Sequence, residues 1–407
     1  MLVTFDQFLD FPEDIINLII YLTKCKVYNL CLVNKYFNNN SKRIKILNNK
    51  KYSKMSDKHL KELVNITSLY LRYDNIILTN EGIKNLNNLI DLKINENNKI
   101  INDSSIKILT NLTSLKIDYN HKITDDAIKN LYKLKHLSIA GSNIKDNTIN
   151  NLTLLTYLDI GRSNFIADGN IKYLTNLTNL RSLILSFNNN ILSIKFLTNL
   201  TFLGLHNNNK ITNNEIEHLT NLNNIELGLN DTITDEGIKR LTNITSINLY
   251  DNNKITENGL SYLTNITHLD LAQNRNISEN FVETIKNLKS LDICSRSNIT
   301  DIGLKKLTNL TFLDISNNDV ITDDGIKNLT GLTELRVSEN GSITDNGIKN
   351  LINLVSIDSS FNELTNKGIK YLTNLEKLYS YDNEMITDDV IKYLPKLKKN
   401  NKMILII

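Results

Sequence analysis

Apolar and polar residues alternate over short runs that recur along the chain. In Leu313-Asp314-Ile315, two apolar residues flank a polar one, which is typical of a short strand with one buried face. The apolar residue that opens this run recurs at Leu69, Leu92, Leu115, Leu137, Leu158, Leu183, Leu203, Ile225, Ile247, Leu269, Leu291, Leu313, Leu335, Ile357 and Leu378. The step is 22 residues from Leu203 to Ile357 and 20 to 25 elsewhere, so the sequence predicts 15 similar units with one strand each.

A short helix is predicted behind each strand. The stretch ITDDGIKNL places Thr322 as N-cap, Asp323 and Asp324 in the first helical turn, and Ile326 and Leu329 on an inward-facing stripe. The glycine that recurs in the DxG pattern is expected to open this helix. One unit cannot bury its own apolar side, so the units must stack. Because helices are wider than strands, we expect the stacked strands to line a concave face.

An asparagine closes the strand in 11 of the 15 units, for example Asn318. Its amide can donate and accept hydrogen bonds, so it can join its own turn to the neighbouring unit. Asp74, Ser142, Ser163 and Arg296 replace it elsewhere, and we expect weaker turns there. The full pattern, L-x-x-L-x-L-x-x-N with a period near 22, resembles the leucine-rich repeat. This resemblance implies an α/β solenoid with parallel concave strands and short convex helices.

The repeat is irregular between residues 160 and 200. The string SFNNNILSIKFLTNL, which follows Leu185, is short and lacks the Thr-Asp helix start, and the unit before it is longer than the others. We therefore expect a local change of curvature in this part of the array.

The first 40 residues follow a different pattern. In FPEDIINLIIYLTKCKVYNLCLVNKYFNN, residues 11–39, Pro12 stands where a first helical turn tolerates proline, and Glu13 and Asp14 follow at the positive end of the predicted helix. Two apolar stripes follow, separated by the polar pair Thr23-Lys24. Helices this apolar and this short cannot enclose themselves, so they need a partner surface or the end of the solenoid.

This segment resembles the F-box. The residues that match the F-box motif in order are Phe11, Pro12, Glu13, Ile16, Ile19, Ile20, Tyr21, Leu22, Leu30, Val33 and Phe37. The chain has Phe11 where the F-box usually has leucine, and it contains no tryptophan. Together with the repeats, the segment resembles the F-box/leucine-rich-repeat family, including versions coded by AT-rich amoebae and giant viruses.

The resemblance implies a function in protein recruitment. The motif residues, Tyr21 apart, would dock on the adaptor subunit of an SCF-type ubiquitin ligase and through it on the cullin ligase, while the repeats hold a substrate protein. The alternative is a leucine-rich-repeat interaction scaffold without a ligase link, whose N-terminal helices only cap the first repeat.

The sequence suggests four segments. These are an F-box-like helical domain at 1–41, a basic connector at 42–58, the solenoid at 59–394 and a C-terminal cap at 395–407. Residues 41–58 carry seven Lys and Arg against Asp57, whereas residues 59–390 have a net charge of −7. The basic run is expected to be a solvated connector, since the acidic array would repel nucleic acid.

Acidic residues recur at the centre of consecutive strands. The central residues are Glu226, Asn248, Asp270, Asp292, Asp314, Arg336 and Asp358. Stacked aspartates about 5 Å apart repel by roughly 0.8 kcal/mol per pair in water, so a compensating interaction is expected. We expect the small side chains beside the acidic row to leave a shallow trough. This trough would receive a basic or polar segment of the substrate protein. Its predicted residues are Tyr250, Asp270, Asp292, Asp314, Arg336, Tyr379 and Tyr381. The alternative is a solvated sheet face whose aspartates only keep it soluble.

Composition excludes several other classes. Cys25, Cys31 and Cys294 are too few and too scattered for a disulfide scaffold, and no apolar run approaches 18 residues. We expect a cytoplasmic protein that does not bind membranes. The six histidines form no metal-ligand pattern, and no phosphate-binding glycine loop is present, so we expect neither an enzyme nor a cofactor.

Overall fold

A computed structural model describes most of the repeat region. The described residues are 45–48, 57–61, 66–71, 78–94, 101–163, 174–295, 297–397 and 402–403. The predicted adaptor-binding residues, from Phe11 to Phe37, lie outside them. The chain divides into two compact units, Met1–Ile191 and Leu192–Ile407.

The first unit alternates short strands and helices. Its described strands are β1 (Lys45–Asn48), β2 (Ser68–Leu71), β3 (Asp91–Ile94), β4 (Ser114–Lys116), β5 (His136–Ser138), β6 (Tyr157–Asp159) and β7 (Ser182–Ile184). Its described helices are α4 (Asp57–Lys61), α5 (Asn80–Ile83), α6 (Asp103–Ile106), α7 (Asp125–Ile128) and α8 (Asp146–Ile149). Each strand pairs in parallel with the next one in the sequence.

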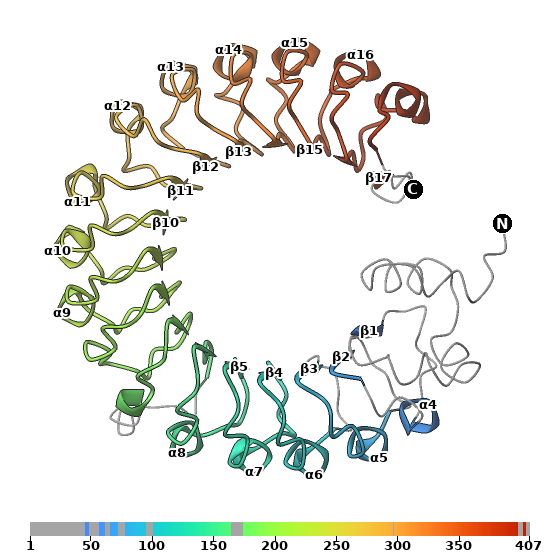
Figure 1. Cartoon of the computed structure of the whole chain (residues 1–407). Helices are drawn as coiled ribbons and strands as arrows, with labels where there is room; N and C mark the ends of the chain where they lie inside the picture. The colour runs from blue at the N-terminus through green and yellow to red at the C-terminus, as the bar shows by residue number, and fades with distance from the viewer. Residues whose placement is uncertain are drawn as a thin grey trace. The chain divides into compact units, whose positions relative to one another are not determined.

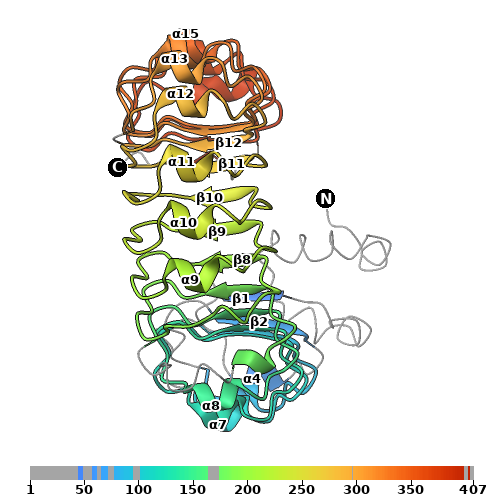
Figure 2. The ribbon, with the colours of Figure 1, turned by 90° about the vertical axis from the view of Figure 1, so that its left-hand side faces the viewer.

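The second unit repeats the same arrangement. Its described strands are β8 (Phe202–Gly204), β9 (Asn224–Glu226), β10 (Ser246–Asn248), β11 (His268–Asp270), β12 (Ser290–Asp292), β13 (Phe312–Asp314), β14 (Glu334–Arg336), β15 (Ser356–Asp358), β16 (Lys377–Tyr379) and β17 (Lys402–Met403). Its described helices are α9 (Asn213–Ile216), α10 (Asp235–Ile238), α11 (Glu257–Leu260), α12 (Glu279–Val282), α13 (Asp301–Leu304), α14 (Asp323–Ile326), α15 (Asp345–Ile348), α16 (Asn366–Ile369) and the 3₁₀ helix η5 (Asp388–Tyr393). The strands again pair in parallel in sequence order, and Figure 2 shows β8 to β12 stacked in this way.

The fifteen predicted strands are confirmed as β2 to β16. The aligned apolar residues are in register, as in the pairing of Leu291 with Leu313 and of Leu313 with Leu335. Two further described strands extend this series. β1 lies within the segment predicted to be a basic connector, and β17 lies within the predicted C-terminal cap.

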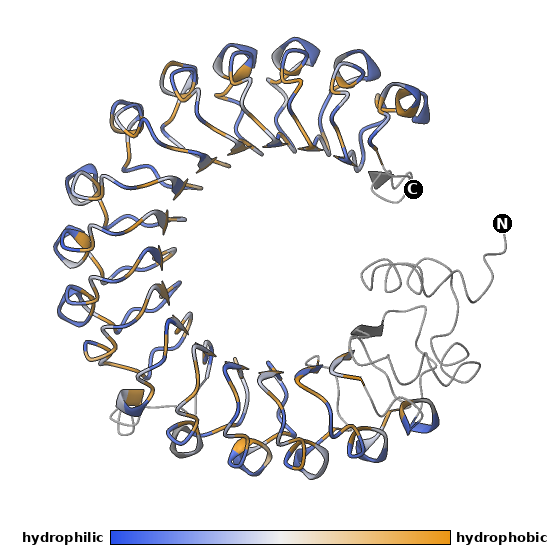
Figure 3. Cartoon of the chain, viewed as in Figure 1, coloured by the Kyte–Doolittle hydropathy of each residue, from blue (hydrophilic) through white to orange (hydrophobic). Residues whose placement is uncertain are grey.

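Strands and helices occupy opposite sides of each unit, with the apolar core between them. In the second unit the helices stand further apart than the strands, so the strand side is concave (Figure 1). Leu313 and Ile315 from the strand side and Ile326 and Leu329 from the helix side are fully buried. Figure 3 shows the same division, with apolar residues between the layers and polar residues on the outer helix surface.

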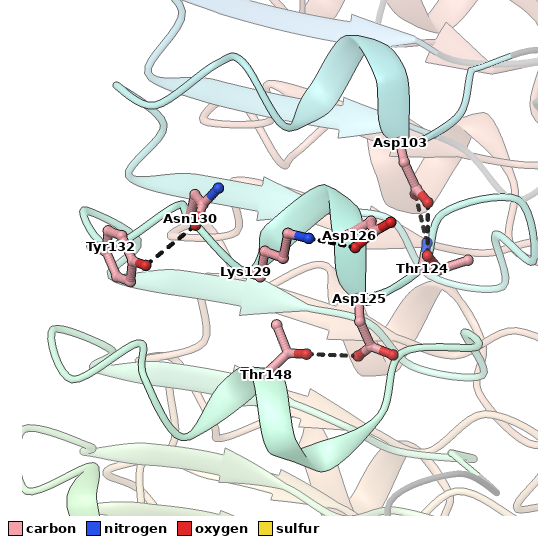
Figure 4. A network of polar contacts seen from close by, with 8 residues as sticks. All are labelled: Asp103, Thr124, Asp125, Asp126, Lys129, Asn130, Tyr132 and Thr148. Carbon is pink, nitrogen blue, oxygen red and sulfur yellow. Dashed lines mark hydrogen bonds and ion pairs between the residues drawn. The ribbon is translucent and has the colours of Figure 1, made fainter.

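The helix starts are linked from one repeat to the next. Thr322 is the N-cap of α14 as predicted, and its hydroxyl accepts a hydrogen bond from the Asp324 backbone N–H at 3.3 Å. The carboxylate of Asp323 instead reaches the following repeat, where it accepts the Thr344 backbone N–H at 2.8 Å and the Thr344 hydroxyl at 2.6 Å. Figure 4 shows an equivalent link in the first unit, from Asp103 to Thr124.

The recurrence of glycine in the DxG pattern has a different physical reason from the predicted one. A Cβ atom at Gly325 would lie 2.4 Å from Oδ1 of Asp301, and one at Gly347 would lie 2.3 Å from Oδ1 of Asp323. The glycine therefore leaves room for the aspartate of the preceding repeat, whose carboxylate holds the next threonine. In α9, where the preceding unit has no described α-helix, Glu215 occupies this position and accepts the backbone N–H of Ile194 at 2.7 Å.

The closing asparagines join neighbouring turns, as predicted. Asn252 is fully buried, and its Nδ2 donates to the carbonyl oxygens of Leu227 at 2.7 Å and Asn230 at 3.1 Å. Its Oδ1 accepts the backbone N–H groups of Lys254 at 2.9 Å and Ile255 at 3.0 Å. One side chain thus satisfies four backbone groups in two repeats.

The serine substitutes make fewer hydrogen bonds, in agreement with the prediction of weaker turns. Ser142 Oγ accepts the backbone N–H of Ile144 at a long 3.5 Å. Ser163 Oγ is buried without a hydrogen-bond partner. Asp74 and Arg296 lie outside the described residues.

The irregular stretch coincides with the division between the units, which falls at Ile191 and Leu192. The change of curvature expected there stays a prediction. No helix in the described part of the chain has the length and apolar character required to cross a bilayer.

Candidate functional site

The candidate site lies on the strand side of the second unit. Parallel register places Asp270 beside Asp292, Asp292 beside Asp314, and Asp314 beside Arg336, each at the last position of its strand. The next two pairings add Asp358 and Tyr379. The predicted ladder of central residues is therefore present, and its charges are acidic except at Arg336.

Part of this ladder forms an open hollow of about 280 Å³. Its lining residues are Asn224, Glu226, Ser246, Ile247, Asn248, His268, Leu269, Asp270, Ser290, Asp292 and Phe312. Three of them are acidic and none is a lysine or arginine. The hollow thus favours a positively charged group over a negative one.

Backbone amides offset the repulsion between the aspartates. Asp270 Oδ1 accepts the backbone N–H of Ala272 at 2.9 Å, and Asp292 Oδ1 accepts that of Cys294 at 2.9 Å. Asp314 accepts the backbone N–H two residues further along in the same way, at 3.0 Å. The Asn248 amide nitrogen also donates to Asp270. These contacts provide the compensating interaction that the row of aspartates requires.

The half-buried carboxylates of Asp270 and Asp292 are hard to ionise. Burial, followed by the charges of Asp292, Asp314 and Glu226, raises the pKa of Asp270 to about 7, against the opposing effect of the Ala272 N–H. Burial is also the main reason that the pKa of Asp292 is raised, and the charge of Asp314 adds to it. Near neutral pH the hollow can therefore gain negative charge when a basic group enters.

Arg336 is held in place by its neighbours. Its guanidinium lies 3.5 Å from Asp314 Oδ2 and 2.9 Å from Glu334 Oε1, and it stands 5.1 Å from the centre of the Phe312 ring. The Arg336 side chain is nevertheless 47% exposed. It is therefore a fixed and accessible positive group next to the acidic row.

Aromatic residues lie at both ends of the predicted trough. Tyr250 faces His206 with ring centroids 6.1 Å apart, outside the hollow. At the other end Tyr379 is 37% exposed, and Tyr381 packs edge-on against Phe361 at 5.1 Å. Tyr250 and the Tyr379–Tyr381 pair are thus in separate places on the same side of the unit.

The structure brings together only part of the predicted set. Asp270 and Asp292 line the hollow, whereas Tyr250, Asp314, Arg336, Tyr379 and Tyr381 do not. The set missed Phe312, His268 and Glu226, which do line it. Phe312 and His268 stand two residues before the central aspartates, so the same alternation of inward and outward positions could have identified them.

The strand side of the first unit carries a different set of polar contacts. The Tyr70 hydroxyl donates to Asp91 Oδ2 at 2.5 Å, and burial together with that contact raises the pKa of Tyr70 to about 12. Lys116 pairs with Asp118 at 2.9 Å, and Lys93 Nζ lies 4.5 Å from the centre of the Tyr70 ring. Acidic and basic groups here satisfy one another.

Among the described residues, no group of three or more His, Cys, Asp or Glu side chains could hold a metal ion. Burial, followed by the charge of Asp292, raises the pKa of the Cys294 thiol to about 12. The thiol is therefore protonated at neutral pH, whereas a nucleophilic cysteine needs a thiolate.

Comparisons with known proteins find similarity to leucine-rich repeats. The family described as "Leucine Rich repeat" matches residues 109–131, 218–241, 306–330 and 328–352. No curated protein sequence matches the chain. The internalin inlF of Listeria monocytogenes is 28% identical, over 78% of this chain and 81% of its own, with a TM-score of 0.36. A leucine-rich-repeat protein of Leptospira interrogans is 24% identical, over 84% of this chain and 91% of its own, with a TM-score of 0.48.

The structure of the TLR13–ssRNA13 complex is also similar. The TLR13 chain is 22% identical in sequence to this chain, over 84% of this chain and 60% of the TLR13 chain, with a TM-score of 0.54. This likeness concerns the fold. The repeat period, the parallel strands and the short backing helices make the protein a leucine-rich-repeat solenoid. Proteins of this class act as interaction scaffolds through their extended sheet surface.

Proposed function

We propose that the protein is the substrate-recognition subunit of an SCF-type E3 ubiquitin ligase. The F-box-like residues between Phe11 and Phe37 dock on the adaptor, and the strand side of the second unit binds the target protein. The observation that carries the proposal is the order of the parts: an F-box-like segment is followed by strand β1 at Lys45 and then by the repeat array.

The second unit supports the target-binding part of the proposal. Its hollow is lined by Glu226, Asp270 and Asp292, and the raised pKa values of the two aspartates reflect carboxylates with little solvation. A lysine or arginine of the target can form ion pairs with this acidic lining. The protein itself acts by proximity, since it holds the target and the ligase in one complex and carries out no chemistry.

Adaptor binding tests the ligase assignment. We expect the Pro12→Ala/Ile16→Asp variant of the full chain to lose at least about 30-fold in affinity for a purified SCF adaptor subunit, measured by isothermal titration calorimetry, because both changes fall in the motif. Tyr262→Ala, which removes an exposed apolar side chain from the array, is the matched control and is expected to bind like the wild type.

Two results would contradict the ligase assignment. Either the wild-type chain does not bind the adaptor, or the double variant binds as tightly as the wild type. A scaffold whose N-terminal helices only cap the first repeat predicts a different outcome, in which the double variant lowers the melting temperature of the first unit and adaptor binding is absent throughout.

A further inference from the structure

The strand side of the second unit changes chemical character in a fixed order. Three zones can be distinguished along the strand order: an acidic zone formed by Glu226, Asp270 and Asp292; Arg336 on β14, which lies between Asp314 on β13 and Asp358 on β15; and an aromatic zone formed by Phe361, Tyr379 and Tyr381. The zones differ in the partner group they favour: a basic group, an acidic group and an apolar or aromatic group, respectively.

Arg336 distinguishes this surface from a uniformly acidic one. If the surface were uniformly acidic, any basic segment would satisfy it in any register. The guanidinium of Arg336 is fixed by Asp314, Glu334 and the Phe312 ring, and it stays accessible, so a lysine or arginine placed over β14 meets a like charge. We therefore expect a partner to place an acidic rather than a basic group over Arg336, whose guanidinium is accessible although it also pairs with Asp314 and Glu334.

The aromatic zone gives the surface a third requirement. Phe361 is 47% exposed and Tyr379 is 37% exposed, although both are large aromatic residues. Phe361 also adopts a left-handed backbone conformation, with φ of 51°, which places its ring in the turn beside Tyr381. The Phe361 and Tyr381 rings, which contact each other, and the exposed Tyr379 offer an apolar surface on which a side chain of a partner can be buried.

The spacing of the zones fixes the spacing of the partner groups. Neighbouring strands are about 4.8 Å apart, so about 14 Å separate Asp270 on β11 from Arg336 on β14, and about 10 Å separate Arg336 from Tyr379 on β16. An extended peptide covers about 3.3 Å per residue. These distances correspond to about four and about three residues.

We propose that the strand side of the second unit binds an extended peptide segment with a lysine or arginine, an aspartate or glutamate about four residues away, and an apolar or aromatic residue about three residues beyond it. The segment crosses the strands in either chain direction. The proposal rests on the proposed function, because it names the substrate class of the target-binding surface. A nucleic acid does not fit, since its phosphates would meet Glu226, Asp270 and Asp292.

A random 12-residue peptide display library tests the proposal with the full chain as bait. We expect the wild-type chain to enrich peptides with basic and acidic residues three to five positions apart, followed by an apolar residue. Selection on the Arg336→Glu variant is expected to replace the acidic position by a basic one, while the other two positions are retained. Arg240→Glu, which changes an arginine that is 59% exposed on the helix side, is the matched control and is expected to keep the wild-type motif.

A charge exchange then measures the contact directly. We expect Arg336→Glu to weaken binding of a synthetic selected peptide by about tenfold or more in fluorescence anisotropy, and a peptide with lysine in place of its acidic residue to recover most of that loss. Arg336→Gln, with an unchanged circular dichroism spectrum, covers the case in which the reversed charge disturbs folding.

The proposal is overturned if no spaced motif is enriched, if both baits enrich the same motif, or if a scrambled peptide of equal composition binds equally well. None of these measurements contains the adaptor. A failure here therefore leaves the ligase assignment standing, and a failure of adaptor binding leaves the peptide motif standing.

Discussion

Replacement of Asn252 by alanine is expected to lower the free energy of unfolding of the second unit by about 3–5 kcal/mol. The substitution removes the side chain that joins the backbone groups of Leu227, Asn230, Lys254 and Ile255. Each buried group left without a partner costs about 1–3 kcal/mol, and partial access of water to the turn reduces the sum.

The adjacent residue offers a matched control for this experiment. Asn253 is also an asparagine but is exposed, so Asn253→Ala is expected to change stability by less than about 0.5 kcal/mol. Urea unfolding followed by circular dichroism measures both variants. A difference below about 1 kcal/mol between the two would contradict the structural role assigned to Asn252. Because each repeat contacts only its neighbours, the loss is expected to be concentrated around β10, which also carries Asn248 of the hollow.

The Asp270→Asn variant is expected to have a flatter dependence of stability on pH than the wild type. In the folded protein the pKa of Asp270 is about 7, whereas an unfolded aspartate has a pKa of about 3.9. Between these values the folded state keeps a proton that the unfolded state has lost. Stability therefore falls as the pH rises from about 4 to about 7, and the loss is complete above that range.

The magnitude follows from the difference between the two pKa values. About three pKa units correspond to about 4 kcal/mol, and solvent screening of a partly exposed carboxylate reduces this to about 1–3 kcal/mol. Asparagine can replace the aspartate because Asn248, at the same position of the preceding repeat, accepts the Tyr250 backbone N–H at 3.0 Å in the same manner. At pH 8 the variant is therefore expected to be more stable than the wild type.

Urea unfolding at pH 5 and pH 8 checks this prediction. Asp382→Asn, which changes an exposed carboxylate in a turn, is the control and is expected to follow the wild-type pH dependence. If Asp270→Asn shows the same change between the two pH values as the wild type, Asp270 does not have the raised pKa on which this argument depends.

The repeat architecture could be predicted because each element depends on local patterns. The alternation in Leu313-Asp314-Ile315 defines a strand, and Thr322 followed by two aspartates defines a helix start. Both features are independent of the neighbouring repeats. For this reason all fifteen strands and the N-cap of α14 could be derived from the chain alone.

Of the features that join one repeat to another, the role of the closing asparagine was predicted but the link between the helix starts was not. Asp323 was predicted only as a residue of the first helical turn. Its carboxylate accepts hydrogen bonds from Thr344 of the next repeat, and the absence of a side chain at Gly347 leaves room for that carboxylate. The sequence shows the recurrence of these residues and not the distance between their side chains. The cause assigned to the glycine was therefore wrong.

The candidate site was predicted in part for the same reason. The central aspartates follow directly from the strand alignment, whereas the hollow also depends on how Phe312 and His268 stand beside them. Arg336 could be identified as an exception in an acidic row, but its fixation by Glu334 and Phe312 required three-dimensional coordinates. The adaptor-binding residues were proposed from the F-box motif, and they remain a prediction.

The most direct test of a receptor with two separate binding surfaces is a titration of one selected peptide into the full chain, with and without saturating SCF adaptor. We predict that the adaptor binds the chain and that the peptide Kd changes by less than about twofold. We also predict that chain, adaptor and peptide form a 1:1:1 complex. Absence of adaptor binding, or displacement of the peptide by the adaptor, would contradict the proposed function.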